Sequence, residues 1–331
     1  MASRGPQTRR PALPAGPEHN GGPRAMSLRL TLFNFILRAI EKPYLARATD
    51  VGALRRQFDR AAERWFIHPE GARYRPYRLG GVRVLEASQG RVDRHKVLIW
   101  LHGGGFFQGS PETHRHLGAA LSARTGARVI LPRYRLTPEH AYPAALEDAR
   151  ACYTALLDAG YDPACIALGG DSAGGGLAFS LLLDAQQRGL PTPACLVAFS
   201  PWTDHTLSGS SLRRNARRDV MLPVTRLAEV RDSYVGSADA RDPLVSPAFA
   251  RFTAPPPALI QASRVEILEE DAASIGARLH DAGGLVRLQF WRRTFHVWQL
   301  MQGRLSEADE ALDQVGAFLA LHLGPTEPDS H

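Results

Sequence analysis

Short apolar runs alternate with longer amphipathic segments through most of the chain. The run Val97-Leu98-Ile99-Trp100-Leu101 contains no polar residue, which is typical of a parallel strand buried on both faces. Similar runs are separated by segments with helical periodicity, and this alternation predicts an α/β fold with a mostly parallel sheet. The predicted strands are 97–101, 128–132, 165–169, 195–200, 258–262 and 285–291, and the predicted helices are about 113–125, 144–159, 174–188, 270–282 and 306–322.

Other segments flank or interrupt this alternation. Apolar residues of 51–66 recur at the spacing of one helical face, and 27–40 has the same amphipathic character. Two short strands, 74–79 and 82–87, are separated by two glycines and are expected to form a hairpin. An irregular insertion, about 203–250, has helical character around 223–235. Because the first two helices precede any strand, we expect them to pack over the sheet as a cap.

The N-terminal 25 residues differ in composition from the rest. They are rich in Pro, Gly and Arg and poor in large apolar groups, so we expect a disordered leader over 1–25. The following segment 30–37 resembles a signal-peptide core with a cleavage site at 46–48. Asn34 interrupts that core, and charged residues and Pro43 come before the site. We therefore expect a cytoplasmic protein, with secretion as the alternative.

Composition excludes several classes of function. The 331 residues carry a formal charge of +7, but the basic residues are scattered among acids, which argues against a nucleic-acid partner. The densest basic cluster is expected to face water, with binding of anionic substrates as the alternative; it comprises Arg213, Arg214, Arg217 and Arg218. Cys152, Cys165 and Cys195 have no metal-like spacing, so neither a metal nor a disulfide framework is predicted. No apolar run reaches 18 residues, so we expect no stable membrane insertion.

A serine flanked by glycines follows the predicted strand 165–169. In Gly170-Asp171-Ser172-Ala173-Gly174, one serine separates that strand from a helix that begins with small residues. Such a serine must occupy a sharp, strained turn, and side chains at the flanking glycines would collide with the two elements. This is the pattern of the nucleophile elbow of serine hydrolases. We predict that Ser172 is a nucleophile, against the alternative of a glycine-rich turn without chemistry.

A second glycine-rich segment follows strand 97–101. The sequence His102-Gly103-Gly104-Gly105-Phe106 falls at the carboxyl edge of the sheet, where open α/β sheets place their sites. Acyl transfer develops negative charge on the former carbonyl oxygen, which backbone N–H groups can stabilise. The predicted oxyanion hole comprises Gly103, Gly104, Gly105 and Ala173.

Chain order selects the general base. Hydrolases of this architecture run nucleophile, acid and histidine along the chain. His296 follows strand 285–291 and fits the last position. His205 precedes any candidate acid strand, and His280 lies in a predicted helix. We predict that His296 accepts the proton of Ser172.

The predicted acid is Glu266, which lies in the loop after strand 258–262. A buried carboxylate there would hold the imidazole in the required tautomer and stabilise its charged form. Glu269, Glu270 and Asp271 fit better as the acidic first turn of the next helix. Asp242 remains the alternative acid.

Taken together, these motifs resemble the hormone-sensitive-lipase family of α/β-hydrolases, bacterial esterases in particular. The likeness covers about 97–323 and is carried by the glycine loop, the elbow, Tyr134-Arg135-Leu136-Thr137-Pro138-Glu139-His140, Ser200-Pro201-Trp202 and His296-Val297-Trp298. The resemblance implies an α/β-hydrolase fold with an eight-stranded, mostly parallel sheet and an N-terminal helical cap. It also implies hydrolysis of short-to-medium-chain acyl esters without a cofactor, and members are often dimers, so a homodimer is expected here.

The chain departs from the family pattern near the acid. Ala262 stands where the family usually has glycine, and Glu266 stands where aspartate is common, although some bacterial members use glutamate. Other residues of the family motifs are predicted to fix the loop and helix behind the site rather than to react: Tyr134, Arg135, Pro138, Glu139 and Asp148.

The expected organisation is a disordered leader over 1–25, a helical cap segment over 26–70, a catalytic domain over 71–323 and a tail over 324–331. The insertion 203–250 lies within the catalytic domain and resembles a second part of the cap. Phe106 and Phe107 are predicted to bind substrate in an aromatic-walled pocket that suits short acyl chains, with a place in the core as the alternative.

The sequence leads to a serine esterase with a Ser172-His296-Glu266 triad that acts on a small-molecule acyl ester. Amide deacylation on the same triad is an alternative, because one fold supports several chemistries. A catalytically silent small-molecule receptor is another, since a plant hormone receptor is similar to this family but lacks the histidine. No triad position is vacant in this chain.

Overall fold

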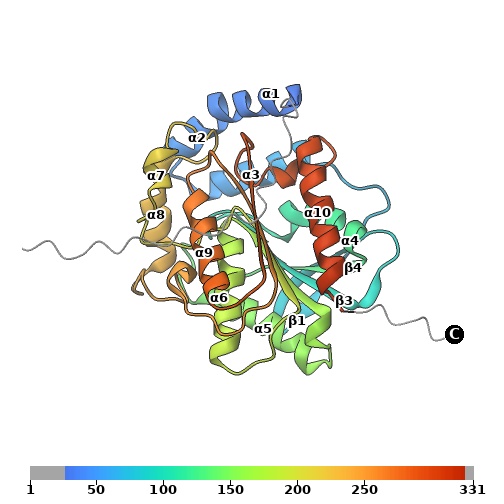
Figure 1. Ribbon diagram of the computed structural model, residues 1–331. Coiled ribbons are helices and arrows are strands. Elements are labelled where there is room, and N and C mark those ends of the chain that lie inside the picture. The colour runs from blue at the N-terminus through green and yellow to red at the C-terminus, as the bar shows by residue number, and fades with distance from the viewer. Residues whose placement is uncertain (1–26, 325–331) are drawn as a thin grey trace, which may run out of the picture.

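The computed structural model describes residues 27–324, and a single twisted sheet forms their centre (Figure 1). The sheet has 8 strands in the order β1-β2-β4-β3-β5-β6-β7-β8. The strands are β1 (Arg73–Leu79), β2 (Val82–Ser88), β3 (Asp93–Leu101), β4 (Ala127–Pro132), β5 (Ile166–Asp171), β6 (Cys195–Phe199), β7 (Ala258–Ser263) and β8 (Val286–Trp291). This confirms the predicted eight-stranded α/β-hydrolase fold.

The sheet is antiparallel at its β1–β2 end and parallel over the rest. The β1–β2 hairpin is antiparallel, and β2 also pairs antiparallel with β4. All pairs from β4–β3 through β7–β8 are parallel, as helical crossovers require. The carboxyl ends of the parallel strands therefore meet at one edge of the sheet, and the loops that leave this edge carry the glycine loop, Ser172 and Glu266.

Helices cover both faces of the sheet (Figure 1). On one face, α5 (Ala144–Asp158), α6 (Ala173–Gln187) and α9 (Glu269–Asp281) share one buried apolar cluster with alternate residues of β3 such as Val97 and Ile99, and α8 (Val224–Val235) of the insertion adds residues to this cluster. On the other face, α4 (Pro111–Thr125) and α10 (Ser306–His322) pack on Leu98 and Trp100. Since β3 is covered on both sides, its residues 97–101 are all buried.

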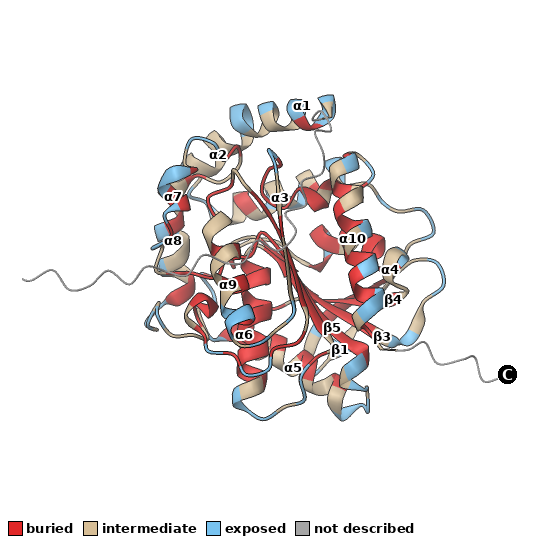
Figure 2. Cartoon of the chain, viewed as in Figure 1, coloured by how far each residue is buried: buried red, intermediate tan, exposed pale blue. Residues whose placement is uncertain are grey.

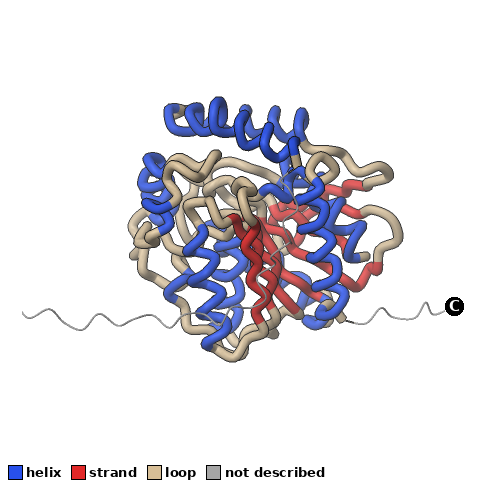
Figure 3. Tube along the Cα trace, turned by 45° about the horizontal axis from the view of Figure 1, so that its top comes forward, coloured by secondary structure: helices blue, strands red, loops and turns tan. Residues whose placement is uncertain are grey.

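The N-terminal helices lie across the carboxyl edge of the sheet (Figure 3). They are α1 (Leu28–Ile36), a π-helical turn (Leu37–Glu41), α2 (Lys42–Arg47) and α3 (Val51–Trp65). The prediction ended the first helix at residue 40, whereas the structure continues it to Arg47. The wide π turn places Pro43 in the first turn of α2. Proline is tolerated at this position because the N–H that it lacks would have no helical acceptor there.

Two strands extend beyond their predicted bounds by two residues or more. β3 begins at Asp93 rather than at residue 97, because its polar first residues extend beyond the covered part of the sheet. β5 ends at Asp171, so the residue before the candidate nucleophile belongs to the strand. Two short helical segments lie within the insertion 203–250: α7 (Ser211–Arg214) and a 3-10 turn (Pro247–Phe249). Further 3-10 turns occupy Pro163–Cys165 and Trp298–Met301.

The cysteines lie inside the fold. Cys152, Cys165 and Cys195 form no disulfide, and all are buried. Burial raises the pKa of the Cys152 and Cys195 thiols to about 12. No helix among residues 27–324 is long and apolar enough to cross a membrane. The predicted leader, 1–25, and nearly all of the predicted tail, 324–331, lie outside the described residues.

Candidate active site

Ser172 occupies the sharp turn between β5 and α6. Its backbone has φ 54° and ψ −123°, a conformation that residues with a side chain rarely adopt. The turn is held from outside, because the Ser172 N–H donates to Phe199 O at 2.8 Å and its carbonyl accepts from Trp202 N at 2.9 Å. The neighbouring strand therefore fixes a strained residue, as the predicted elbow requires.

The flanking glycines have no room for a side chain. A Cβ at position 170 would lie 2.4 Å from Gly174 O, and one at position 174 would lie 2.0 Å from Leu101 O. Gly176, one turn into α6, is equally enclosed, with Trp202 O at 1.9 Å from its Cβ position. Close approach of backbone to backbone explains these glycines better than flexibility does.

His296 joins the serine to Glu266. Its Nε2 lies 2.9 Å from Ser172 Oγ, and its Nδ1 lies 2.6 Å from Glu266 Oε2. Glu266 is fully buried, and its other carboxylate oxygen accepts the Ser263 N–H at 2.7 Å. The side chain of Asn215, in the loop after α7, donates to Glu266 O at 2.8 Å. The structure thus brings the three residues predicted as nucleophile, base and acid into one hydrogen-bonded line.

The surroundings of His296 favour its charged form. Burial alone would lower the pKa of the imidazole, but the hydrogen bond and charge of Glu266 outweigh it, with smaller contributions from Asp219 and Asp171. The pKa of His296 is therefore raised above 6.5. An imidazole in this setting takes up a proton more readily than a free one.

The other predicted acids have different partners. Asp242 accepts the N–H of Leu244 within its own turn. Asp271 accepts the backbone N–H groups of Thr203 and Asp204, both at 2.8 Å. Glu269 pairs with Arg214 and Arg264 at the start of α9. These carboxylates are engaged elsewhere and leave Glu266 as the partner of His296.

The glycine loop presents backbone N–H groups beside Ser172. The N–H groups of Gly104, Gly105 and Ala173 have no acceptor among the described residues, so they are free to meet a ligand oxygen. Gly103 is a correction to the predicted oxyanion hole, because its N–H already donates to Asp171 Oδ2 at 3.1 Å. A side chain at position 103 would also collide with that carboxylate, at 2.3 Å.

Asp171 is a functional-site residue that the sequence reasoning missed. Its carboxylate accepts from Trp100 Nε1 at 3.0 Å and lies 3.2 Å from His114 Nε2, in addition to the bond from Gly103. Burial alone would raise the pKa of this carboxyl, but His114, Trp100 and His102 outweigh it and lower the pKa below 3.8. Asp171 therefore stays ionised and ties the glycine loop to the elbow. Its position next to Ser172 in the Gly-x-Ser-x-Gly motif was the feature of the sequence that could have indicated a role in the site.

The two predicted pocket aromatics have different places. Phe106 is only 1% exposed and stacks on Tyr234 with ring centroids 3.6 Å apart. It does not line an open pocket, and the alternative of a core aromatic holds for it. The ring of Phe107 lies 2.9 Å from the Cβ position of Gly105, and Val230 of α8 lies 3.2 Å from the same point. Val230, within the insertion, thus lies beside the glycine loop, a contact that the sequence reasoning did not predict.

The segment 134–140, which follows β4, supports the glycine loop from behind. The Tyr134 hydroxyl donates to His102 O at 2.6 Å, and its ring stacks on that of His102. Arg135 pairs with Asp148 at 2.9 Å. Pro138 lies in the same loop and follows a cis peptide bond after Thr137.

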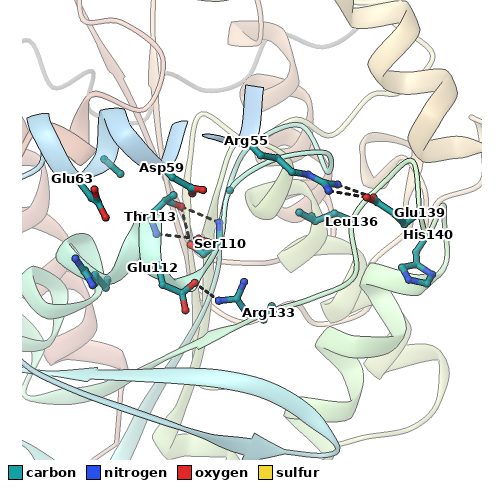
Figure 4. Close-up of a pocket in the computed structure, with 13 residues that line it drawn as sticks. Arg55, Asp59, Glu63, Ser110, Glu112, Thr113, Arg133, Leu136, Glu139 and His140 are labelled. Atoms are coloured by element: carbon teal, nitrogen blue, oxygen red, sulfur yellow. Dashed lines mark hydrogen bonds and ion pairs between the residues drawn. The ribbon is translucent and has the colours of Figure 1, made fainter. Parts of the chain in front are cut away.

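Arg55 of α3 fastens the N-terminal helices to this segment (Figure 4). Its guanidinium donates to both carboxylate oxygens of Glu139, at 2.8 and 2.7 Å, and lowers the pKa of Glu139 to about 2. The same side chain donates to the carbonyls of Phe107 at 2.7 Å and Thr137 at 2.8 Å. One arginine therefore links α3 to the glycine loop. A charged cleft of about 590 Å³ lies beside it, and neither Ser172 nor His296 lines that cleft.

Known proteins share this arrangement of sequence and fold. A family model of the alpha/beta hydrolase fold matches residues 98–300, which include the glycine loop, the elbow and His296. An acetyl-hydrolase from Streptomyces hygroscopicus is 40% identical over 229 residues, 69% of this chain and 77% of that protein. An esterase from Acinetobacter venetianus is 35% identical over 245 residues, 74% of this chain and 80% of that protein.

Solved structures agree with these matches. The crystal structure of an esterase from the bacterial hormone-sensitive lipase family is similar with a TM-score of 0.86 at 33% identity. The match covers 91% of this chain and 100% of that chain. The likeness therefore extends beyond the matched family model to the N-terminal helices.

Proposed function

Because this chain belongs to the hormone-sensitive-lipase-like family of α/β-hydrolases and is a carboxylic ester hydrolase, we propose that it cleaves short-to-medium-chain acyl esters through a Ser172-His296-Glu266 triad. The observation that supports this most is the 2.9 Å contact between Ser172 Oγ and His296 Nε2, which the 2.6 Å contact to Glu266 continues. This is the geometry in which a histidine activates a serine.

The reaction begins when His296 Nε2 accepts the proton of Ser172 as Oγ attacks the ester carbonyl. Negative charge then develops on the carbonyl oxygen, and the N–H groups of Gly104, Gly105 and Ala173 stabilise it. His296 donates its proton to the departing alcohol oxygen, and the acyl group remains on Ser172. A water molecule that loses a proton to His296 then attacks the acyl-enzyme, and His296 returns this proton to Ser172 Oγ as the acid is released. Glu266 holds the imidazole and stabilises its charged form throughout.

The preference for short acyl chains rests on the wall beside Gly105. Phe107 and Val230 both approach that glycine closely, so the space next to the oxyanion donors is narrow. A series of aryl esters from acetate to palmitate tests the proposal. Faster turnover of palmitate than of butyrate would contradict it.

Replacement of Ser172 by alanine tests the nucleophile. We expect Ser172→Ala to lower turnover of p-nitrophenyl butyrate by about 10⁴- to 10⁶-fold, since only binding and oxyanion stabilisation remain. Circular dichroism should show an unchanged fold. Covalent labelling of the wild type, but not the variant, by a fluorophosphonate probe distinguishes an enzyme from a silent receptor. Full activity of the variant would exclude the assignment.

The remaining expectations are proposals of the same kind. An acyl anilide assayed beside the matching ester tests amide deacylation. We expect a homodimer, which light scattering would reveal as twice the 36.2 kDa of the chain. Cell fractionation tests the proposed cytoplasmic location.

A further inference from the structure

The outer face of α1 exposes large apolar side chains. Leu28 is 89% exposed, Leu32 58% and Phe35 68%, and these residues recur at the spacing of one helical face. Ile40, in the π turn that follows, is 62% exposed. Figure 2 shows α1 standing clear of the buried sheet, with exposed residues on its outer side. Four large apolar side chains in one row form an unusual surface for a water-facing helix.

The inner face of the same helix already fixes it to the protein. Leu30 is 1% exposed and packs in a cluster with Phe295 and Trp298, and Phe33 lies against Phe295 with ring centroids 6.5 Å apart. The helix N-terminus is held as well, since Ser27 N and Oγ both donate to Glu307 at 3.1 Å. The inner face and the N-terminus of the helix therefore attach α1 to the protein. The exposed apolar residues on the outer face contribute nothing to this attachment.

Arginines border this apolar row. Arg29 lies on α1 and donates to Arg304 O, and Arg38 in the π turn donates to the carbonyls of Arg217 and Arg218. Asn34 donates to Arg293 O, which brings a further arginine to the edge. Among residues 27–324 no carboxylate pairs with the guanidinium groups of Arg29, Arg38, Arg217, Arg218 and Arg293. The border therefore keeps its positive charge.

Two partners that the protein itself could supply, its N-terminal residues 1–26 and a second copy of the chain, are poorly suited to cover this face. Residues 1–26 offer only Met1, Leu13 and Met26 as large apolar groups, and they add four arginines. A second copy packed face to face would bring like-charged borders together, which is unfavourable. A surface with an apolar interior and negative headgroups matches both the row and its border.

We propose that the exposed face of α1, bordered by arginines, docks the protein on a lipid surface that carries anionic headgroups. Leu28, Leu32, Phe35 and Ile40 enter the acyl boundary, while the arginines contact headgroups. On the inner face of α1, Phe33 lies against Phe295, which precedes His296 in the chain, so docking turns the carboxyl edge of the sheet toward the lipid. The proposal concerns a surface and does not depend on the esterase assignment.

Flotation of the full chain with vesicles tests the docking. We expect binding to phosphatidylcholine vesicles that contain about one third phosphatidylglycerol, and at least tenfold weaker binding to phosphatidylcholine alone. Raising the salt from about 0.1 M to 1 M should weaken binding, because it screens the arginines. The double substitution Leu32→Glu with Phe35→Glu should reduce binding about a hundredfold or more, since it removes two inserted side chains.

A matched control lies at the opposite edge of the molecule. Leu285 is 62% exposed and Leu321 78%, and the substitutions Leu285→Glu and Leu321→Glu should leave vesicle binding unchanged. Both double variants should keep wild-type turnover of soluble p-nitrophenyl butyrate and the same thermal melt, which shows that they fold. Equal binding to neutral and anionic vesicles, or no binding at all, would overturn the proposal. So would a vesicle-independent dimer that the α1 variant abolishes, since the face would then serve a second copy.

Discussion

Three hydrogen bonds hold Glu266 in place beside His296. One carboxylate oxygen contacts His296 Nδ1 and the other accepts the Ser263 N–H, so the group cannot rotate without losing a bond. Its backbone carbonyl is held by Asn215. The longer side chain of glutamate, compared with the aspartate common in the family, reaches the imidazole from a fully buried position.

We expect Glu266→Gln to lower kcat on p-nitrophenyl butyrate by about 10³- to 10⁴-fold, because a neutral amide neither fixes the tautomer nor stabilises the imidazolium. Asp242→Asn is the matched control, since the amide oxygen can still accept the Leu244 N–H. Steady-state kinetics of both variants provide the test. A large loss in Asp242→Asn with little change in Glu266→Gln would reverse the assignment of the acid.

The raised pKa of His296 predicts a pH profile. A general base must be neutral, so kcat/KM should fall as pH decreases through the pKa of His296, with the acidic limb centred above pH 6.5. Removal of the Glu266 charge leaves burial opposed only by the smaller contributions of Asp219 and Asp171, so Glu266→Gln should shift this limb to lower pH. A limb that moves upward, or stays in place, would show that Glu266 does not set the pKa.

Position in the chain predicted Ser172, Glu266 and His296, which lie in one hydrogen-bonded line, because chain order and local motifs are properties of the sequence itself. The same reasoning assigned a donor to Gly103 and overlooked Asp171. Both errors have one cause: the Gly103 N–H bonds to a carboxylate 68 residues away. Which N–H groups remain free depends on tertiary contacts that local patterns do not report.

At the scale of elements, glycines decide how α6 meets the sheet. The helix starts directly after Ser172, and its first turns lie against the backbone at Leu101 and Trp202. A run of small residues was readable from the sequence as the start of a helix. The reason for it, contact between the helix backbone and neighbouring carbonyls, becomes clear from the packing.

Two helical glycines therefore predict opposite effects of the same substitution. Gly176→Ala should lower the free energy of unfolding by about 2 kcal/mol or more, because its Cβ would lie 1.9 Å from Trp202 O. Gly276→Ala in α9 should raise it by about 0.5–1 kcal/mol, because its Cβ would meet Leu288 at an ordinary 3.4 Å and alanine favours the helix. Urea denaturation measures both. Equal effects would show that α6 can shift away from the sheet.

Strand patterns were informative in the centre of the sheet and weaker at its margins. The apolar run 97–101 predicted β3, but its polar first residues from Asp93 were left out. Likewise, the first helix was predicted to end at residue 40, whereas a π turn allows it to continue to Arg47. Polar strand ends and irregular helical turns depend on neighbours rather than on local periodicity.

At the scale of the whole molecule, the N-terminal helices are joined to the site at defined points. Arg55 connects α3 to the glycine loop, and Lys42 of α2 donates to the carbonyls of Ala216 and Asp219 at 2.7 Å. The Asp219 carboxylate in turn accepts the N–H of Ile267, next to Glu266. The sequence predicted a helical cap, but these long-range contacts could not be read from it.

Arg55→Ala should therefore affect the reaction although the residue lies far from Ser172 in sequence. We expect kcat/KM for p-nitrophenyl butyrate to fall about tenfold, because the Phe107 carbonyl beside the glycine loop loses its donor. Glu139→Gln keeps the bonds from Arg55 to the two carbonyls and should cost much less. If both variants lost kcat/KM equally, the ion pair between Arg55 and Glu139 would be responsible, and not the bond from Arg55 to the Phe107 carbonyl.

The buried cysteines have a practical consequence. Since the folded chain offers no accessible thiol, maleimide chemistry has no native target, and one introduced cysteine becomes a unique point of attachment. Leu285 precedes β8, at the edge of the sheet opposite to Ser172, and is largely exposed. A protein tethered to a solid support through Leu285→Cys would hold every molecule in one orientation, with Ser172 directed away from the support.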